Sequence, residues 1–169
     1  VCNALDTLLV HRNRAATCLS LVGQKLAAAG VEFRADAESF GFLQQIAPDK
    51  TVLASETDWG TEFLALVLSV KVVENLDEAI DHIFRYSTGH SDAILTQNKQ
   101  AASRFLDEVD SAVVYVNAST RFTDGGQFGL GADVAVSTKK LHARGPMALE
   151  GLTTYKWIVE GEGHVRPDE

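Results

Sequence analysis

Apolar residues follow two patterns along the chain. A spacing of three or four residues predicts helices, and short continuous runs predict strands. Between residues 13 and 29 apolar residues recur every three or four positions, which is typical of an amphipathic helix, and Gly30 ends that segment. Asn75 can cap another helix, because its side chain accepts hydrogen bonds from the first free amides, with Glu78 as partner three positions on. Shorter runs rich in Val, Leu and Ile lie between the helical segments and are typical of strands. The pattern predicts strands at 4–11, 31–34, 63–73, 92–95 and 112–117, and helices at 13–29, 37–46, 76–86 and 99–109.

The alternation of strands and helices predicts the fold class. It is typical of an α/β fold with a largely parallel sheet and helices on both faces. Residues 112–117 are almost continuously apolar, as in a strand that is buried on both of its faces. The pattern changes after Asn117, where residues 119–131 are rich in glycine and polar groups. Residues 153–159 are predicted to form an extra strand that reaches outward.

The balance of charge narrows the classes of partner. The chain has 169 residues, with 15 Lys and Arg against 23 Asp and Glu, which gives a net charge of −8. Nucleic acids and anionic membranes attract clustered basic residues, so the sequence predicts neither of them as a partner. No apolar stretch approaches the length that is needed to span a bilayer.

The chain has two cysteines, Cys2 and Cys18, which are too few for a disulfide framework. His11 lies between them, but the paired ligand spacing of zinc sites is missing, so we predict no metal site. Two free thiols fit a reducing compartment, and we expect the protein in the cytoplasm. Cys18 lies on the apolar face of a predicted helix and is interpreted as structural. The residues alone leave two interpretations open for Cys2, a nucleophile or a buried cysteine without a chemical role.

The segment Ser119–Gly131 gathers candidate chemistry in one loop. It holds hydroxyl groups, a guanidinium, a carboxylate and four glycines directly after the most strand-like segment of the chain. Ligands of α/β sheets bind at the carboxyl ends of strands, and loops of this length are usually functional. The glycine spacing matches neither a P-loop nor a dinucleotide fingerprint. The alternative is a long connection that is merely rich in turns.

Four segments of the chain carry long and specific motifs. They are VCNALDTLLVH at residues 1–11, HSDAILT at 90–96, VYVNASTRFTDGGQFGLGADVAVST at 114–138 and KLHARGPMALEGLTTYKW at 140–157. Together they resemble the γ-glutamyl phosphate reductases, or glutamate-5-semialdehyde dehydrogenases, a family of the aldehyde dehydrogenase superfamily. The resemblance implies NADPH-dependent reduction of L-glutamyl 5-phosphate to L-glutamate 5-semialdehyde with release of phosphate, as a step of proline biosynthesis.

The resemblance also implies roles for single residues. The family's nucleophilic cysteine lies in a V-C-N-A segment, which maps onto Cys2, and its attack gives a thioester. Glu62 and Phe63 resemble the element with which the superfamily holds the nicotinamide ribose, although a Leu-Ala pair follows them in place of Gly-Pro. Arg121, Thr123 and Asp124 are the candidates for binding the substrate's carboxylate, amine or phosphate.

The resemblance further implies a division of the chain. We expect residues 1–131 to form a catalytic domain and residues 132–169 to form a C-terminal segment with an oligomerisation strand. The family's NADPH-binding domain lies upstream of the nucleophile, so we expect the chain to lack that domain and to be inactive alone. The implied partners are further copies of the chain, joined through that strand, and the implied functional link is to glutamate 5-kinase. The motifs fit both a single-function reductase and the reductase half of a bifunctional proline-pathway synthase.

Two other functions compete with a reductase. The first is a non-catalytic interaction or oligomerisation module that keeps the fold without the chemistry. The second is an aldehyde dehydrogenase with another substrate, and the specific STRFTDGG motif at residues 119–126 argues against it.

Overall fold

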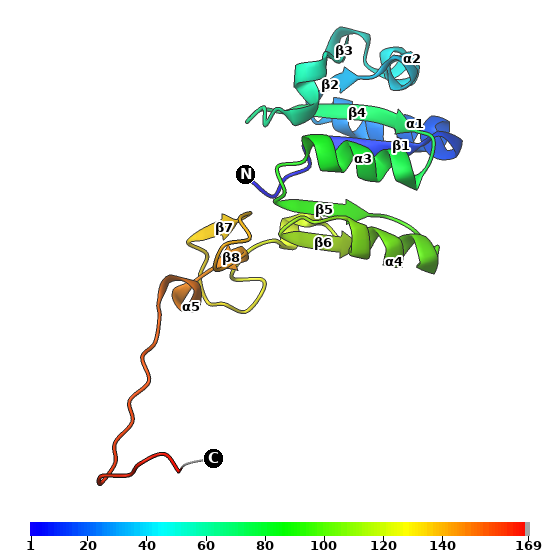
Figure 1. The fold of residues 1–169 in the computed structure, drawn as a ribbon. Coiled ribbons are helices and arrows are strands. Elements are labelled where there is room, and N and C mark those ends of the chain that lie inside the picture. The colour runs from blue at the N-terminus through cyan, green and yellow to red at the C-terminus, as the bar shows by residue number, and fades with distance from the viewer. Residues whose placement is uncertain (168–169) are drawn as a thin grey trace.

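Strands and helices alternate over the first 116 residues, as the hydrophobic pattern predicts (Figure 1). The computed structural model describes residues 1–167. In chain order, the strands and α-helices are β1 (Thr7–His11), α1 (Arg12–Ala28), β2 (Glu32–Ala35), α2 (Ala37–Ile46), β3 (Thr51–Leu53), β4 (Val67–Val73), α3 (Leu76–Tyr86), β5 (Ser91–Ile94), α4 (Lys99–Glu108), β6 (Val113–Val116), β7 (Ala135–Ser137), β8 (Gly145–Met147) and α5 (Leu149–Leu152).

The strands pair mainly in parallel. β1, β4, β2 and β3 form one parallel sheet in that order, and β5 pairs with β6 in parallel. In the larger sheet Thr7 lies opposite Ser69, so β1 and β4 begin at the same edge. α1 and α2 cover one face of this sheet, whereas α3 lies over the other face and touches α4 (Figure 1). The predicted α/β fold, with a largely parallel sheet and helices on both faces, is confirmed.

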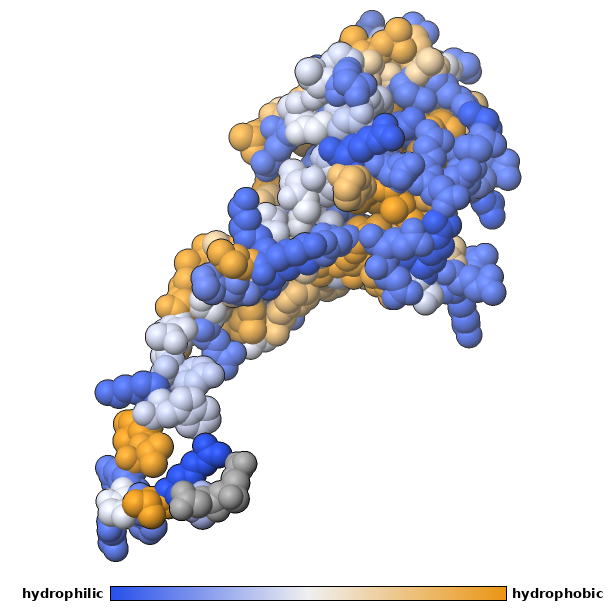
Figure 2. Space-filling view, in the orientation of Figure 1, coloured by the Kyte–Doolittle hydropathy of each residue, from blue (hydrophilic) through white to orange (hydrophobic). Residues whose placement is uncertain are grey.

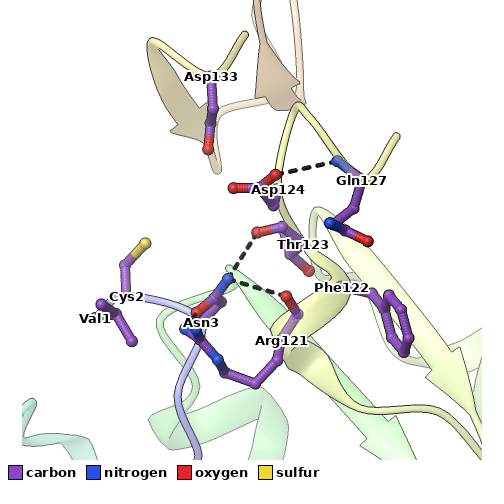
Figure 3. Close-up of a pocket in the computed structure, with 9 residues that line it drawn as sticks. All are labelled: Val1, Cys2, Asn3, Arg121, Phe122, Thr123, Asp124, Gln127 and Asp133. Carbon is purple, nitrogen blue, oxygen red and sulfur yellow. Dashed lines mark hydrogen bonds between the residues drawn. The ribbon is translucent and has the colours of Figure 1, made fainter. Parts of the chain in front are cut away.

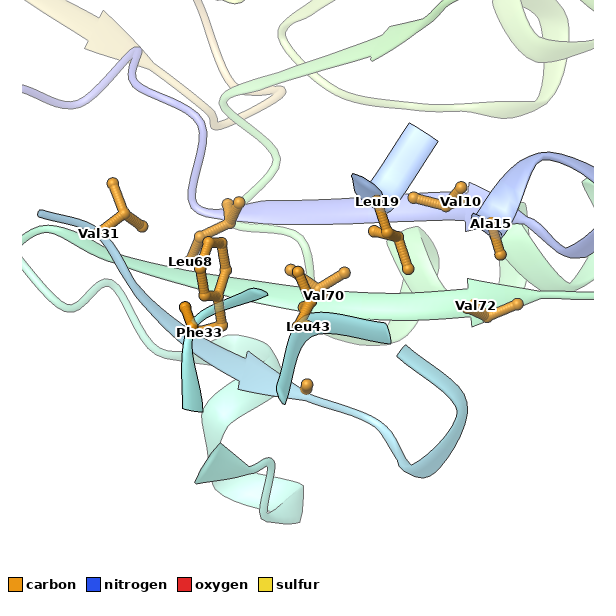
Figure 4. Packing of buried hydrophobic residues seen from close by; sticks show 11 residues of the cluster. Val10, Ala15, Leu19, Val31, Phe33, Leu43, Leu68, Val70 and Val72 are labelled. Carbon is orange, nitrogen blue, oxygen red and sulfur yellow. The ribbon is translucent and has the colours of Figure 1, made fainter. Parts of the chain in front are cut away.

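The core lies between the larger sheet and the helices α1 and α2 (Figure 4). Phe33 of β2 is fully buried, and Leu19 of α1 and Leu43 of α2 are almost fully buried beside it. The two helices approach closely at Gly23, where an added Cβ would lie 2.9 Å from Leu43 Cδ2. The cluster consists of Val10, Ala15, Leu19, Val31, Phe33, Ala35, Leu43, Ala47, Leu68, Val70 and Val72.

Several predicted boundaries differ from the structure, and three short strands were not predicted. β4 begins at Val67 rather than at residue 63, because Leu64 adopts a left-handed φ of 54°, which interrupts an extended run. β3, β7 and β8 were not predicted, since each has three residues and so shows no periodicity. β7 and β8 are antiparallel, unlike the strands before them.

The C-terminal segment extends away from the rest of the molecule (Figures 1 and 2). Residues 153–159, where a strand was predicted, form no strand within the single chain, because the segment is extended but pairs with no other strand among residues 1–167. Tyr155 and Trp157 are 80% and 85% exposed, and their rings meet edge to face with centroids 5.9 Å apart. Figure 2 shows other apolar residues gathered over the β7–β8 region, where Val134, Leu141 and Leu149 are exposed.

Candidate active site

Cys2 lies in a segment that is fastened to a loop far along the sequence. Asn3, the next residue, is nine-tenths buried, and its side-chain Nδ2 donates to the carbonyl oxygens of Arg121 at 3.3 Å and Thr123 at 2.9 Å. The Thr120 hydroxyl donates to the Asn3 carbonyl oxygen at 2.9 Å, and Arg121 Nη1 donates to Asn3 Oδ1. These contacts bring residues 1–3 and 120–123 together at one site, although about 120 positions separate them.

The two segments line a pocket of about 420 Å³ (Figure 3). Its walls include Cys2, Asn3, Arg121, Asp124 and Asp133. Cys2 is exposed, and Figure 3 shows its side chain directed away from the hydrogen bonds that hold Asn3. The thiol is therefore accessible from a pocket that also offers a guanidinium and two carboxylates, and the interpretation of Cys2 as a buried cysteine is wrong.

Thr123 anchors the loop to the smaller sheet. Its side chain is 2% exposed, and its hydroxyl lies 2.7 Å from Ser91 Oγ and 2.8 Å from the Tyr115 hydroxyl. Ser91 is the first residue of β5. The loop leaves the carboxyl end of β6 but doubles back to the amino end of β5. The pocket therefore lies away from the carboxyl ends of the strands, where the site was expected, because the contact with Ser91 holds the loop at the amino end of β5.

The rest of the loop forms a compact turn that brings Asp133 over the pocket. Asp124 Oδ1 accepts from the Gln127 amide at 3.0 Å, and the amide of Leu130 donates to the Gly125 carbonyl at 2.8 Å. Gly125 lies so close to the returning chain that an added Cβ would be 1.9 Å from the Ala132 carbonyl oxygen. Only glycine permits this approach.

The two residues expected to hold the nicotinamide ribose lie at the same edge of the sheet as Cys2, but outside the pocket. Glu62 is exposed and Phe63 is half-buried just before β4, and the Phe63 ring lies 5.9 Å from the Arg34 guanidinium carbon. Burial raises the pKa of Asp6, and the charges of Asp92 and Glu62 raise it further against a hydrogen bond from Thr7. The Glu62 carboxylate is thus close enough to Asp6, just before β1, to raise the pKa of the Asp6 carboxyl group.

Cys18 lies elsewhere, on α1, where it packs against the core, and burial raises the pKa of its thiol. Among the described residues 1–167, no three His, Cys, Asp or Glu side chains gather as metal ligands would. Over the same residues, no helix combines the length and the apolar character that crossing a membrane requires.

Comparison with known proteins identifies the family. Residues 43–158 match the aldehyde dehydrogenase family. The chain belongs to the aldehyde dehydrogenase family. Among curated members, it is 57% identical over 166 residues to a protein of Dehalococcoides mccartyi and 58% identical over 168 residues to one of Roseiflexus castenholzii. Both relatives are named gamma-glutamyl phosphate reductase, and 98% of this chain aligns with 39% and 40% of their lengths.

Solved structures of this family give the same result. The crystal structure of the gamma-glutamyl phosphate reductase from Thermotoga maritima matches with a TM-score of 0.87 at 53% identity, over 99% of this chain and 39% of that one. The enzyme of the same name from Saccharomyces cerevisiae matches with a TM-score of 0.57 at 32% identity, over 80% of this chain and 36% of that one. The resemblance inferred from the motifs is confirmed, and the chain spans about two fifths of the length of these relatives.

The structure adds two residues that the sequence did not single out. Asn3 and Asp133 both line the pocket, and neither belongs to a pattern of spacing that predicts a role. Asn3 could have been noticed only because it follows Cys2 within the V-C-N-A segment. Asp133 lies after the glycine-rich turn, and its position depends on how closely Gly125 approaches Ala132.

Proposed function

We propose that Cys2 is the nucleophile of an NADPH-dependent reductase that converts L-glutamyl 5-phosphate to L-glutamate 5-semialdehyde and phosphate. The observation that carries the proposal is the exposed Cys2 thiol in a pocket that it shares with Arg121 and Asp124. The names of the curated relatives support the substrate class. A reductase of this kind performs a biosynthetic step that leads to proline in the cytoplasm.

The chemistry requires a thiolate with open access to an acyl carbon. The Cys2 sulfur attacks the carbonyl carbon of the acyl phosphate, the bond from that carbon to the phosphate oxygen breaks, and a thioester remains. After two-electron reduction the carbon–sulfur bond breaks, which releases the aldehyde and returns the thiolate. The Cys2 backbone amide is a candidate donor to the developing oxyanion. No base is needed to activate water, because the acyl group leaves as an aldehyde.

Members of the aldehyde dehydrogenase family use nicotinamide cofactors, and a bound NADPH supplies the hydride for the reduction. In this chain Glu62 and Phe63 are the proposed contacts of its ribose. The exposed Glu62 carboxylate fits that role because it can accept hydrogen bonds from hydroxyl groups at the sheet edge that carries the pocket.

Arg121, Thr123 and Asp124 are the residues that we assign to the binding of the glutamyl group. Arg121 has guanidinium N–H groups beyond the one that it donates to Asn3, and such groups suit a carboxylate or a phosphate. Asp124 uses Oδ1 within its own turn, which leaves Oδ2 for an ammonium group. Thr123 pairs its hydroxyl with Ser91 and Tyr115, so its contribution is to hold the loop beneath the substrate.

The test is NADP⁺ reduction with glutamate 5-semialdehyde and phosphate, measured on this chain and on the complete product of its gene. Cys2→Ala is expected to lower kcat of the complete product by about three orders of magnitude or more, because the covalent route is lost. Cys18→Ala is the matched control, since Cys18 packs against the core away from the pocket, and it should leave the rate unchanged. Activity that survives Cys2→Ala would remove Cys2 as the nucleophile, whereas a parent without activity would favour a non-catalytic module or a dehydrogenase of another substrate.

The proposal also covers the oligomerisation of the chain and the enzyme that supplies its substrate. The exposed aromatic segment around Tyr155 and Trp157 is the proposed oligomerisation strand, since an extended segment gains a ladder only from another chain. Glutamate 5-kinase is the proposed functional partner, because an acyl phosphate must be formed by phosphoryl transfer to a carboxylate.

A further inference from the structure

The segment that carries Cys2 has no secondary structure to fix its position. Residues 1–6 precede β1 and belong to no helix or strand. A nucleophile must lie within about 3–3.5 Å of the carbon that it attacks, and a displacement of about 1 Å can cost roughly a hundredfold in rate. Some other contact must therefore hold Cys2, and the structure provides that contact at the next residue.

Asn3 uses its whole side-chain amide to bind the loop. Nδ2 donates to the carbonyl oxygens of Arg121 and Thr123, while Oδ1 accepts from Arg121 Nη1. Its backbone carbonyl accepts from the Thr120 hydroxyl at 2.9 Å. Asn3 is 9% exposed, so water cannot easily replace these bonds and their loss would leave buried polar groups unpaired.

Arg121 contributes to this attachment twice, through its carbonyl oxygen and its guanidinium. One guanidinium nitrogen, Nη1, binds Asn3 beside the nucleophile, while the Arg121 side chain also lines the pocket. The Thr123 carbonyl, the other acceptor of Asn3, is fixed because the Thr123 hydroxyl is buried against Ser91 and Tyr115. A continuous set of hydrogen bonds thus joins the residue after Cys2 to strands β5 and β6.

We infer that Asn3 and Arg121 form a clamp that positions Cys2, so that Arg121 acts on the reaction chiefly by holding the nucleophile. The inference rests on the proposed role of Cys2 and goes beyond it, because it gives Arg121 a positioning role in addition to its proposed contact with the substrate. Positioning and substrate binding make different predictions. A lost clamp lowers kcat with little change in KM, whereas a lost substrate contact raises KM.

The first experiment is a double-mutant cycle in the complete gene product with Asn3→Ala, Arg121→Ala and both together. Each single variant is expected to lower kcat by about 10-fold to 100-fold with KM for glutamate 5-semialdehyde within twofold of the parent. The double variant should lose no more than the worse single variant, because both changes break one unit. Arg121→Lys keeps one donor and should recover part of kcat. Arg14→Ala, on the exposed side of α1, is the matched arginine control and should change neither constant.

The second experiment measures how the clamp restricts the motion of Cys2. It needs no turnover and uses this chain itself. A nitroxide label is attached to Cys2 in a Cys18→Ala background, and its mobility is measured by electron paramagnetic resonance. Asn3→Ala and Arg121→Ala should each sharpen the spectrum, Arg121→Lys should do so less, and Arg14→Ala should leave it unchanged. Circular dichroism identifies a variant that fails to fold, in which case Arg121→Lys alone decides.

Two results would overturn the clamp. One is a raised KM with unchanged kcat in Arg121→Ala, together with losses that add to those of Asn3→Ala, which would make Arg121 a substrate contact without a positioning role. The other is a label on Cys2 that is equally mobile in parent and variants. A complete gene product without Cys2-dependent turnover would instead disprove the proposed function, while the spectra would still report whether the clamp exists.

Discussion

Asn3 and Cys2 are neighbours in sequence with opposite environments. The Asn3 amide is buried and fully paired, whereas Cys2 is exposed. The sequence could predict Cys2 and Arg121, because a motif surrounds each of them. It could not predict the role of Asn3, although Asn3 lies in the same motif as Cys2, because its hydrogen-bond partners lie 117–120 positions away. The sequence therefore predicts chemical roles for residues that lie in motifs, but it does not predict the hydrogen bonds that join residues far apart in the chain.

A second buried side chain, His82 on α3, gives the molecule a pH dependence. It is 7% exposed and packs its ring against Trp59 and Tyr86, and its Nε2 has no hydrogen-bond partner among the described residues. Burial, and secondly the charge of Lys71, lowers the pKa of His82 to about 4, while Glu78 and Glu56 act weakly in the other direction.

The sign of the pH effect follows from the neutral form being favoured in the folded state. Above the unfolded pKa of 6.5 the imidazole is neutral in both states, so nothing is lost there. As the pH falls from 6.5 towards 4, the unfolded chain binds a proton that the folded chain does not, and folding weakens. We expect a loss of about 1–2 kcal/mol from this residue over that window, reduced from the full shift by partial solvation.

Urea unfolding at a series of pH values checks this prediction. His82→Phe removes the titration while keeping a ring against Trp59, so its stability should fall less between pH 6.5 and 4 than that of the parent. His164→Phe, in the exposed C-terminal segment, is the control and should leave the slope unchanged. Equal slopes in parent and His82→Phe would show that other groups set the acid sensitivity.

At the scale of elements, the longer helices follow directly from local sequence. α3 begins as predicted, because Asn75 Oδ1 accepts from the Glu78 amide at 3.0 Å. The Glu78 carboxylate bonds the Glu74 amide rather than that of Asn75, so the predicted capping box closes one residue earlier. The short strands β7 and β8 could not be predicted, because their extended form depends on pairing with each other rather than on local pattern.

The turn at Gly125 shows the same dependence on distant contacts and can be tested by one substitution. Gly125→Ala places a Cβ 1.9 Å from the Ala132 carbonyl oxygen and 3.0 Å from Asp133 Cα, so the returning chain must move. We expect a loss of about 1–3 kcal/mol in the free energy of unfolding, as for other overpacked sites, with Asp133 displaced from the pocket.

The free energy of unfolding from urea titration measures this effect. Gly41→Ala is the matched control, since an added Cβ there meets nothing within 4 Å. Gly41 lies within α2, so its replacement should be neutral or slightly stabilising. A Gly125→Ala variant as stable as the parent would mean that the 132–133 segment adjusts freely and does not fix Asp133.

At the scale of the whole molecule, an α/β body carries an extended C-terminal segment (Figure 1). The hydrophobic pattern predicts the body well, because its core is formed by periodic apolar faces on α1, α2 and the strands. The same pattern predicts a strand in the C-terminal segment that the single chain does not form, since apolar residues at 155–159 favour a strand only if another strand lies alongside.

Removal of residues 155–169 tests whether the C-terminal segment contributes to the stability of the α/β fold or only to oligomerisation. The side chains of Tyr155, Trp157 and Val159 are 80–90% exposed and contribute little to the core. We expect a melting temperature within about 2 °C of the parent at concentrations where both are monomeric, since a loss of 1 kcal/mol would shift it by about 2–4 °C or more.

Sedimentation velocity at higher concentration measures the other half of this prediction. The parent should form an oligomer that the shortened chain does not form, and Trp157→Ser should weaken it. Lys156→Ser, which changes a charge in the same segment, is the control. A parent chain that stays monomeric at all concentrations would disprove assembly through this segment.

The attachment of Asn3 to Thr123 has a consequence for the order in which the protein is made. The bond closes a loop of about 120 residues, so its entropic cost is among the largest in the chain and it cannot form until residue 123 has been synthesised. Cys2 emerges from the ribosome first, and Thr123 emerges only after about 120 further residues have been synthesised. Throughout that interval the thiol is present but the pocket is not, so the arrangement of the site is one of the last features that the nascent chain acquires.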